Sequence, residues 1–272
     1  MNPQEKMNPQ RISLSKMSEH KHIVALSGGK DSCALAIRLK EINPETEYTY
    51  ISTPTGNEPQ DVFRHFKKLE KILDAPVRFL KPYAGDGLIE NIRDNNAIPN
   101  FRMRFCTRQL KIEPTMSFLK ANSPCIHYVG LRADEEERQG IYGSVEGVKH
   151  AYPMREWGWS IEDVWDYLEK KEISIPERTD CSLCFFQRIL QWKRLWLNNR
   201  KEFEKGIAIE KEMNRTFRTP GRDTWPTDLE SLGKEFESGR KVPGEDKLNE
   251  QINQGRLFGD CDLNALCRVC TM

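Results

Sequence analysis

The chain has 272 residues, of which 38% are hydrophobic and 31% are charged, enough to bury one sizeable α/β core with a smaller appended region. Its 42 basic and 41 acidic residues leave a net charge of +1, which excludes a global basic field for nucleic acid and leaves only local patches. No apolar stretch approaches the roughly 20 residues of a membrane span, and the polar N-terminal segment lacks the apolar region of a signal peptide. We therefore expect a cytoplasmic protein without membrane association, whose eight cysteines are metal ligands, sulfur carriers or core thiols rather than disulfides.

Three parts follow one another along the chain. Residues 1–20 repeat Met-Asn-Pro-Gln without sustained apolar periodicity, and we expect a flexible tail. Residues 21–175 alternate strand and helix patterns, which predicts a doubly wound, mostly parallel α/β domain. Residues 176–272 begin at a proline and are expected to form a smaller, mainly helical region that carries the later cysteines.

The first half of the α/β domain shows a βαβαβ rhythm. Apolar runs predict buried strands over 22–26, 47–52 and 77–80. Apolar residues at helical spacing lie between them: Ala34, Leu35, Leu39 and Ile42 in the first helix, and Val62, Phe63, Phe66, Leu69, Ile72 and Leu73 on one face of the second. The second strand runs out at residues 53–58, and the carboxyl end of a strand is where open α/β sheets place ligands.

The turn after the first strand, residues 27–32 (Ser-Gly-Gly-Lys-Asp-Ser), is predicted to cradle phosphate groups. It lies at a strand-to-helix junction, where outward-pointing backbone N–H groups favour an anion. Gly28 and Gly29 let the backbone approach a phosphate closely, and Lys30 adds a positive charge. A Walker A loop would need a glycine in place of Val24, and a Gly-x-Gly-x-x-Gly dinucleotide loop is absent, so the turn belongs to neither class.

A basic stretch, residues 100–114, surrounds Cys106 with Arg102, Arg104, Arg108 and Lys111. Cations near a thiol lower its pKa, so we expect Cys106 to favour the thiolate, the form that binds metals and attacks sulfur. The alternative is a solvated basic helix start with a buried cysteine.

A fourth strand is expected over 125–129, and Gly130 and Arg132 follow it. An arginine just beyond a strand end can grip a phosphate through two hydrogen bonds, which makes Arg132 a candidate phosphate ligand. The acidic run 135–137 is expected on a solvated helix face. Ser160, with Asp163 three residues later, predicts the start of a further helix.

Two Cys-x-x-Cys pairs, Cys181 with Cys184 and Cys267 with Cys270, are each able to grip a metal through two thiolates. All four together would suit a structural zinc, but the segment between the pairs far exceeds zinc-ribbon spacing, and Cys106 would be left out. A [4Fe–4S] cluster tolerates dispersed ligands because the fold gathers them, so the sequence favours iron–sulfur over zinc.

Residues 22–190 together resemble the phosphoadenosine-phosphosulfate (PAPS) reductase family within the PP-loop ATP pyrophosphatase superfamily, with its adenine nucleotide alpha hydrolase-like fold. The resemblance rests on the 27–32 loop, Thr55-Gly56, the Arg-x-Cys106…Leu-Lys-x-x-Pro pattern, Gly130-x-Arg132, Trp159…Asp163-Val-Trp165 and Cys181-x-x-Cys184. It implies that Ser27, Gly28, Gly29, Lys30, Asp31, Ser32, Thr55 and Gly56 hold ATP, with Gly130 and Arg132 as further candidates. It also places Cys106, Cys181 and Cys184 where iron–sulfur members ligate their cluster.

Two differences from the sulfonucleotide reductase pattern indicate which function within this family is expected. Sulfonucleotide reductases lack an intact Gly-Gly-Lys-Asp-Ser loop and end in a Glu-Cys-Gly-Leu-His type motif, which this sequence does not carry. An intact loop implies ATP cleavage, as in ATP sulfurylase small subunits, tRNA-thiolating enzymes and the ATP pyrophosphatase components of bacterial DNA phosphorothioation systems (Dnd and Ssp types). Phe105 replaces one of two adjacent reductase cysteines, so the fourth cluster ligand is expected from the tail: Cys267 first, with Cys261 and Cys270 as alternatives.

The expected reaction attaches AMP to a substrate oxygen and releases pyrophosphate, so that sulfur can replace that oxygen. Lys30, Asp31 and Ser32 are the candidate catalytic residues: Lys30 and the loop amides would stabilise the leaving pyrophosphate, and Asp31 would orient a Mg²⁺ ion that bridges phosphate oxygens. Sulfur would come from a cysteine desulfurase, with Cys270 or Cys33 as a possible persulfide carrier.

A nucleic-acid acceptor is favoured by the basic residues around Cys106 and by Lys193, Arg194 and Arg200. DNA is preferred because no appended RNA-binding module is visible; tRNA thiolation is the second reading and sulfonucleotide reduction the third. Assembly as a homodimer is left open.

Overall fold

The computed structural model describes residues 20–83, 85–135, 144–221 and 223–245. Nearly all of the expected N-terminal tail and the cysteines at 261, 267 and 270 lie outside these ranges. Within them, no helix is both long and apolar enough to cross a membrane.

Five parallel strands form one sheet in the order β3-β2-β1-β4-β5. They are β1 (Lys21–Ala25), β2 (Tyr48–Ser52), β3 (Val77–Phe79), β4 (Cys125–Tyr128) and β5 (Val148–Ala151). The strand order reverses between β1 and β4, and the crevice beyond their carboxyl ends is where open α/β sheets bind ligands. The predicted parallel α/β fold is confirmed.

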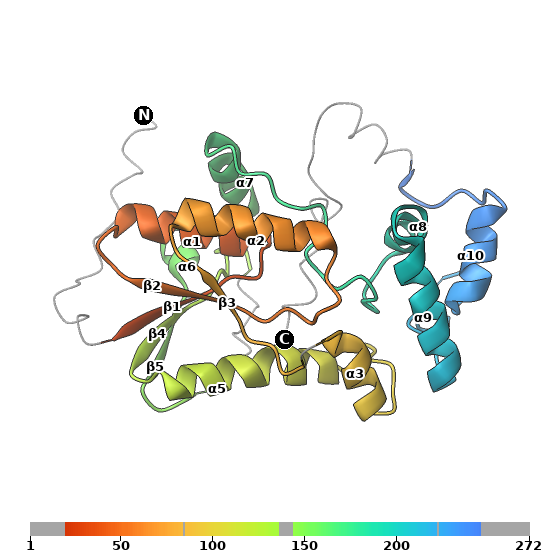
Figure 1. Ribbon diagram of the computed structural model, residues 1–272. Helices are drawn as coiled ribbons and strands as arrows, with labels where there is room; N and C mark the ends of the chain where they lie inside the picture. Colours follow the sequence, from red (N-terminus) through yellow and green to blue (C-terminus); the bar gives the residue numbers. More distant parts are fainter. Residues whose placement is uncertain (1–19, 84, 136–143, 222, 246–272) are drawn as a thin grey trace.

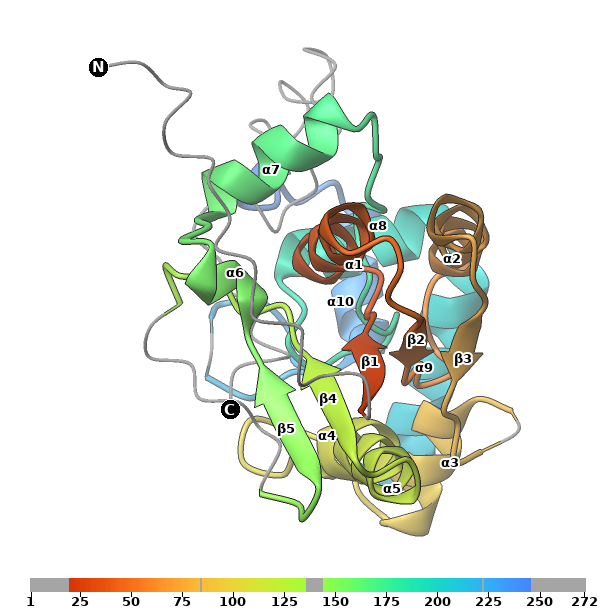
Figure 2. The same ribbon diagram turned by 90° about the vertical axis from the view of Figure 1, so that its left-hand side faces the viewer.

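Helices cover both faces of the sheet (Figures 1 and 2). Helices α1 (Lys30–Ile42), α2 (Gln60–Leu73), α6 (Pro153–Glu156) and α7 (Ile161–Lys170) pack on one face, and α5 (Glu113–Ala121) packs on the other. The expectation that Ile72 shares the buried face of α2 is wrong, because Ile72 is exposed and His65 completes the buried stripe with Val62, Phe66, Leu69 and Leu73.

A second core lies at one end of the sheet, where Figure 1 shows α8, α9 and α10 grouped together. It is built from α3 (Gly87–Asp94), α4 (Phe105–Thr107), η3 (Arg108–Ile112), α8 (Ile189–Asn198), α9 (Arg200–Met213) and α10 (Leu229–Glu237). Trp192, Phe203 and Phe217 are fully buried at its centre. The expected helical C-terminal region is therefore present, and its core also takes in residues from the segment 88–110.

A π-helical turn, η3, interrupts the helical run from α4 to α5. Pro114 lacks an N–H group, and in a continuous α-helix its ring would clash with the carbonyl group of Leu110. The wider π turn avoids this conflict, and the N–H group of Glu113 donates to the carbonyl oxygen of Arg108 instead. Cys106 stands just before this turn and packs against the second core.

Candidate nucleotide loop and thiol pocket

The loop 27–32 joins β1 to α1 at the carboxyl edge of the sheet. Gly28 has a φ of +81°, and a Cβ there would lie 3.2 Å from the ring of Phe66, so the position suits glycine. The N–H group of Ser27 donates to Ser32 Oγ at 3.1 Å, and Ser32 Oγ donates to the carbonyl oxygen of Gly29 at 3.0 Å. Because Gly29 is the N-cap of α1, no side chain caps the first-turn N–H groups, which suits the turn to an anion.

Lys30, Asp31 and Arg132 form a charged cluster beside this loop. Lys30 is only 7% exposed, and its Nζ lies 3.5 Å from Asp31 Oδ2. Arg132 Nη1 lies 3.0 Å from Asp31 Oδ1, which links the end of β4 to the start of α1. Gly130 permits this approach, because a Cβ there would lie 3.2 Å from the carbonyl oxygen of Asp31.

Three carboxylates surround the Arg132 guanidinium. Besides Asp31, its Nε donates to Asp134 Oδ1 at 2.8 Å, and its Nη2 lies 3.6 Å from Glu135 Oε1. The expected bidentate grip of Arg132 on a phosphate stays a prediction, and in this structure its donors are engaged by these acids. The expectation of a solvated helix face is wrong for Glu135, which is buried and accepts the N–H group of Arg132.

The turn after β2 brings Thr55 and Gly56 close to the start of α3. Gly56 has a φ of +83°, and a Cβ there would lie 2.6 Å from the carbonyl oxygen of Gly85, so close backbone packing accounts for this glycine. The N–H groups of Thr55 and Gly56 donate to the Glu58 carboxylate at 2.7 Å and 2.9 Å. Their expected contact with ATP stays a prediction, since these two donors already have a partner.

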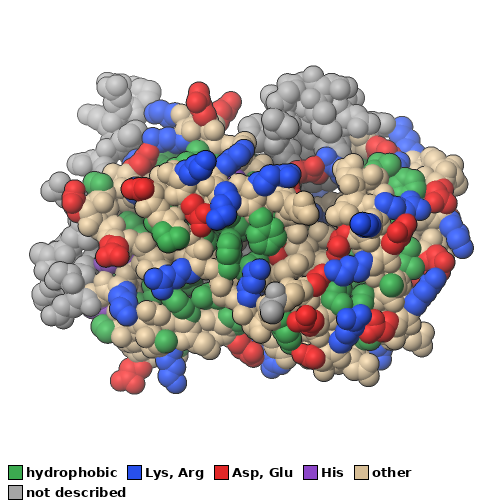
Figure 3. All heavy atoms as spheres, in the orientation of Figure 1, with side chains coloured by type: hydrophobic (Ala, Val, Ile, Leu, Met, Phe, Trp, Pro, Cys, Tyr) green, Lys and Arg blue, Asp and Glu red, His purple; other side chains and the backbone are tan. Residues whose placement is uncertain are grey.

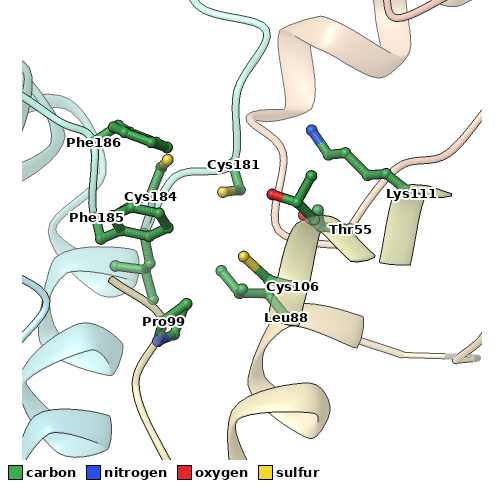
Figure 4. A pocket seen from close by; sticks show the side chains of 11 residues that line it. Thr55, Leu88, Pro99, Cys106, Lys111, Cys181, Cys184, Phe185 and Phe186 are labelled. Atoms are coloured by element: carbon green, nitrogen blue, oxygen red, sulfur yellow. The ribbon is translucent and has the colours of Figure 1, made fainter. Parts of the chain in front are cut away.

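Cys106, Cys181 and Cys184 line one pocket (Figure 4). Cys106 comes from α4, and the other two come from the loop before α8. In Figure 4 the sulfur atoms of Cys106 and Cys181 point into the same space, and Cys184 lies beside Phe185 and Phe186. The structure thus brings together three of the four predicted cluster ligands, while Cys267 lies outside the described residues.

The three thiols are the donor type that a [4Fe–4S] cluster uses, and the cluster stays a prediction. Among the described residues, no three His, Cys, Asp or Glu side chains converge closely enough to hold one metal ion. Zinc needs its ligands around one point, whereas each thiolate of a [4Fe–4S] cluster binds a different iron. The donor chemistry of Cys106, Cys181 and Cys184 agrees with the predicted cluster, whose ligand geometry stays a prediction.

The match to a known protein family covers both the loop 27–32 and Cys106. Residues 21–179, more than half of the chain, match the phosphoadenosine phosphosulfate reductase domain. The chain belongs to the PAPS reductase family. The matched range of this PAPS reductase domain ends just before Cys181 and Cys184. No curated protein matches the sequence.

Solved structures show a more distant likeness to this PAPS reductase family member. A PAPS reductase from Candida auris in complex with phosphate is 13% identical, covers 65% of this chain and 83% of its own, and has a TM-score of 0.48. The U34-tRNA thiolase NcsA from Methanococcus maripaludis, with its [4Fe–4S] cluster, is 17% identical, covers 93% of this chain and 80% of its own, and has a TM-score of 0.45.

The expected lowering of the Cys106 pKa is wrong for this PAPS reductase domain. Burial raises the pKa of Cys106, the neighbouring Cys184 raises it further, and Lys111 offsets only part of this. The surrounding arginines have other environments: Arg102 is exposed, Arg104 lies over the ring of Phe186, and Arg108 pairs with Glu113.

Cys184 is the thiol in the pocket that ionises most readily. A hydrogen bond from Cys181 lowers the pKa of Cys184, and the same bond raises the pKa of Cys181. Cys33, in contrast, is a packed core thiol of α1: it is fully buried, and burial strongly raises its pKa. Cys33 therefore does not suit the role of a sulfur carrier.

One short segment connects the nucleotide loop of the PAPS reductase domain with the thiol pocket. A Cβ at Gly29 would lie 3.4 Å from Thr179 Oγ1, so this segment passes directly beside the loop. The N–H group of Ser182 donates to the carbonyl oxygen of Asn57 at 2.7 Å, and that of Leu183 donates to Asn57 Oδ1 at 2.9 Å. Asn57 is buried and holds the cysteine loop in place, and only its position after Gly56 signals this role in the sequence.

His65 supports the nucleotide loop from α2. Its Nε2 lies 3.4 Å from Cys33 Sγ, and the ring also hydrogen bonds to the backbone of Gly28. Burial lowers the pKa of His65 from 6.5 to about 4. A histidine whose folded pKa is depressed contributes stability that is present above its unfolded pKa and is lost as the pH falls toward the folded value.

We therefore expect the midpoint temperature of thermal unfolding to decrease as the pH is lowered from about 6.5 to about 4, in part because His65 must become charged. The contribution of this one group is up to about 3 kcal/mol. His65→Gln should lower the midpoint at neutral pH but flatten its decline with acid, as calorimetry over this range would measure. A decline in the variant as steep as in the natural chain would contradict this role.

Proposed function

We propose that this protein is an ATP pyrophosphatase that adenylates an oxygen of a nucleic acid so that sulfur can replace it. The acceptor that we propose is DNA, and the modification is DNA phosphorothioation. Members of the PAPS reductase family are enzymes. The observation that supports the proposal is the segment 179–184, which runs from the candidate nucleotide loop to the thiol pocket, so that an activated acceptor and a sulfur-handling group would lie close together.

The loop supplies the charge stabilisation that this reaction needs. The acceptor oxygen attacks the α-phosphorus of ATP, the bond to the bridging oxygen of the β-phosphate breaks, and the electron pair leaves with pyrophosphate. Lys30 and the first-turn N–H groups of α1 would favour the charge that develops on this leaving group, with Mg²⁺ neutralising the phosphates. Arg132 holds the Asp31 carboxylate in a fixed position beside the loop.

The thiol pocket would hold the sulfur-handling group. Cys106, Cys181 and Cys184, with Cys267 as the fourth ligand, would hold a [4Fe–4S] cluster that binds the incoming sulfur. A cysteine desulfurase would supply that sulfur. Asn57 fixes the backbone of the cysteine loop through its two hydrogen bonds, so the thiols stay in place relative to the nucleotide loop.

Only the basic residues next to the pocket support the proposal that a nucleic acid binds. Lys193, Arg194 and Arg200 are engaged by Glu245, Glu177 and Glu237, respectively. Figure 3 shows basic and acidic side chains interleaved over the face seen in Figure 1. The acceptor is therefore expected to meet the protein beside Cys106, around residues 100–104, rather than along α8 and α9.

Deletion of the gene tests the proposal. We expect phosphorothioate dinucleotides to disappear from the host DNA, as measured by mass spectrometry of digested nucleosides, and to return with the natural gene but not with Lys30→Ala. Lys67→Ala, at an exposed lysine of α2, is the matched control and should restore them. Retained phosphorothioates together with loss of a thionucleoside from tRNA would assign the chain to tRNA thiolation instead.

A further inference from the structure

We propose that the aromatic rim, made of Phe101, Arg102, Met103, Arg104 and Phe186, binds an unstacked base of a single-stranded acceptor at the mouth of the thiol pocket. This inference rests on the proposed function and names the strand state that the site accepts. The rim is continuous with the pocket, because Phe186 lines it beside Cys184 (Figure 4).

Apolar exposure is concentrated at this rim. Phe101 is 37% exposed and Met103 is 45% exposed, and they account for half of the four large apolar side chains that are exposed among the described residues. The Phe101 ring packs perpendicular to Phe185 and Phe186, with centroids 5.6 Å and 4.9 Å away. It is thus held in place from behind while part of it faces solvent, an arrangement suited to stacking of a base.

The turn that carries Phe101 is formed in advance of any ligand. Asn100 Oδ1 accepts the N–H groups of Arg102 and Met103 at 2.9 Å and 3.0 Å, and the N–H group of Asn100 donates to the carbonyl oxygen of Met103 at 3.1 Å. These three bonds close the turn on itself. A ligand therefore meets a fixed ring and loses little affinity to ordering the loop.

The charge at the rim suits a phosphate next to the stacked base. Arg102 is exposed and pairs with no carboxylate among the described residues. Arg104 lies 5.1 Å from the centroid of the Phe186 ring. Aromatic rings with adjacent arginines are the usual means of binding single strands, because every base has a face to stack and every nucleotide carries a phosphate.

A single strand fits the rim better than the other candidates. Bases in a duplex are stacked on one another and cannot lie flat on a protein ring without leaving the helix. A stable protein partner needs an interface of at least about 1,000 Å², with a large apolar centre, whereas this rim exposes only two apolar side chains. The rim has the scale of one or two nucleotides.

The test is the affinity of the full-length protein for a fluorescently labelled single-stranded DNA of about 12 nucleotides, measured by anisotropy. We expect Phe101→Ala to weaken binding about tenfold or more and Phe101→Trp to retain it. Leu197→Ala, on α8, is the matched control: Leu197 is 59% exposed and its loss should leave affinity unchanged. Arg102→Ala should reduce the dependence of log affinity on log salt by about 0.7.

The outcomes separate this inference from the proposed function. If the natural chain binds neither single-stranded DNA nor single-stranded RNA, the proposed nucleic-acid acceptor is wrong. If it binds a single strand and Phe101→Ala binds equally well, the rim alone is wrong. Tighter binding of the natural chain to the matching duplex than to the single strand would also contradict base binding at the rim. So would a Phe101→Ala variant that loses binding to a cysteine desulfurase but keeps its affinity for DNA. The affinity for ATP should be the same in all variants.

Discussion

Lys30→Ala is expected to lower the rate of pyrophosphate release from ATP by about 100- to 1,000-fold, the usual effect of removing one group that stabilises developing charge. The effect should be large because Lys30 is buried at the start of α1, where water cannot replace its charge. A coupled pyrophosphate assay with the acceptor present would measure it. ATP binding should weaken much less, since the loop amides remain.

Lys67→Ala serves as the control for this variant. Lys67 lies on the exposed side of α2 and pairs with Glu70 at 3.0 Å, so its removal changes the net charge equally without touching the loop. Its rate should match that of the natural chain. A Lys30→Ala protein with an unchanged thermal midpoint and an unchanged rate would show that the loop does not cleave ATP.

Anaerobic purification should yield protein with iron and sulfide in the proportions of one [4Fe–4S] cluster, and Cys181→Ala should remove nearly all of both. Cys106→Ala and Cys184→Ala should do the same, because a cluster held by too few thiolates is lost. Metal analysis by mass spectrometry, with visible absorption, measures this. Chelation or exposure to air should abolish sulfur transfer and leave ATP binding intact.

Cys125→Ala is the matched control for the thiol variants. Cys125 is buried like Cys184 but lies on β4, against α5 on a face of the sheet and away from the pocket. Its loss should leave the iron content unchanged. Stoichiometric zinc without iron in the natural chain would contradict the cluster, and the tail cysteines would then be the second half of a zinc site.

Local patterns predicted the elements whose sequence signal is local. The strand, glycine turn and helix at 22–42 follow from apolar spacing, and the predicted cap at Ser160 is confirmed by its mutual hydrogen bonds with Asp163. The strand β5 had no such signal, because Val-Lys-His-Ala is short and only partly apolar. It becomes a strand through four paired positions with β4, a tertiary effect.

The candidate site shows the same division between local and tertiary effects. Residue types and spacing marked Cys106, Cys181 and Cys184, which the fold places in one pocket. Charge counting failed for Cys106, because its pKa depends on burial, which neighbouring residues in the sequence do not reveal. Asn57 went unnoticed for a related reason: its partners, Ser182 and Leu183, are distant in the sequence.

The second core also sets the order in which parts of this protein can fold during translation. Leu88, Ile92 and Leu110 emerge from the ribosome with the sheet, but the side chains that cover them, such as Leu183 and Trp192, are made much later. Domains fold largely in the order in which they are synthesised. The apolar surface beside the Cys106 thiol therefore stays uncovered until the later segment has been made. A cofactor bound by all three thiols can therefore be inserted only after the loop with Cys181 and Cys184 has been translated, nearly eighty residues after Cys106.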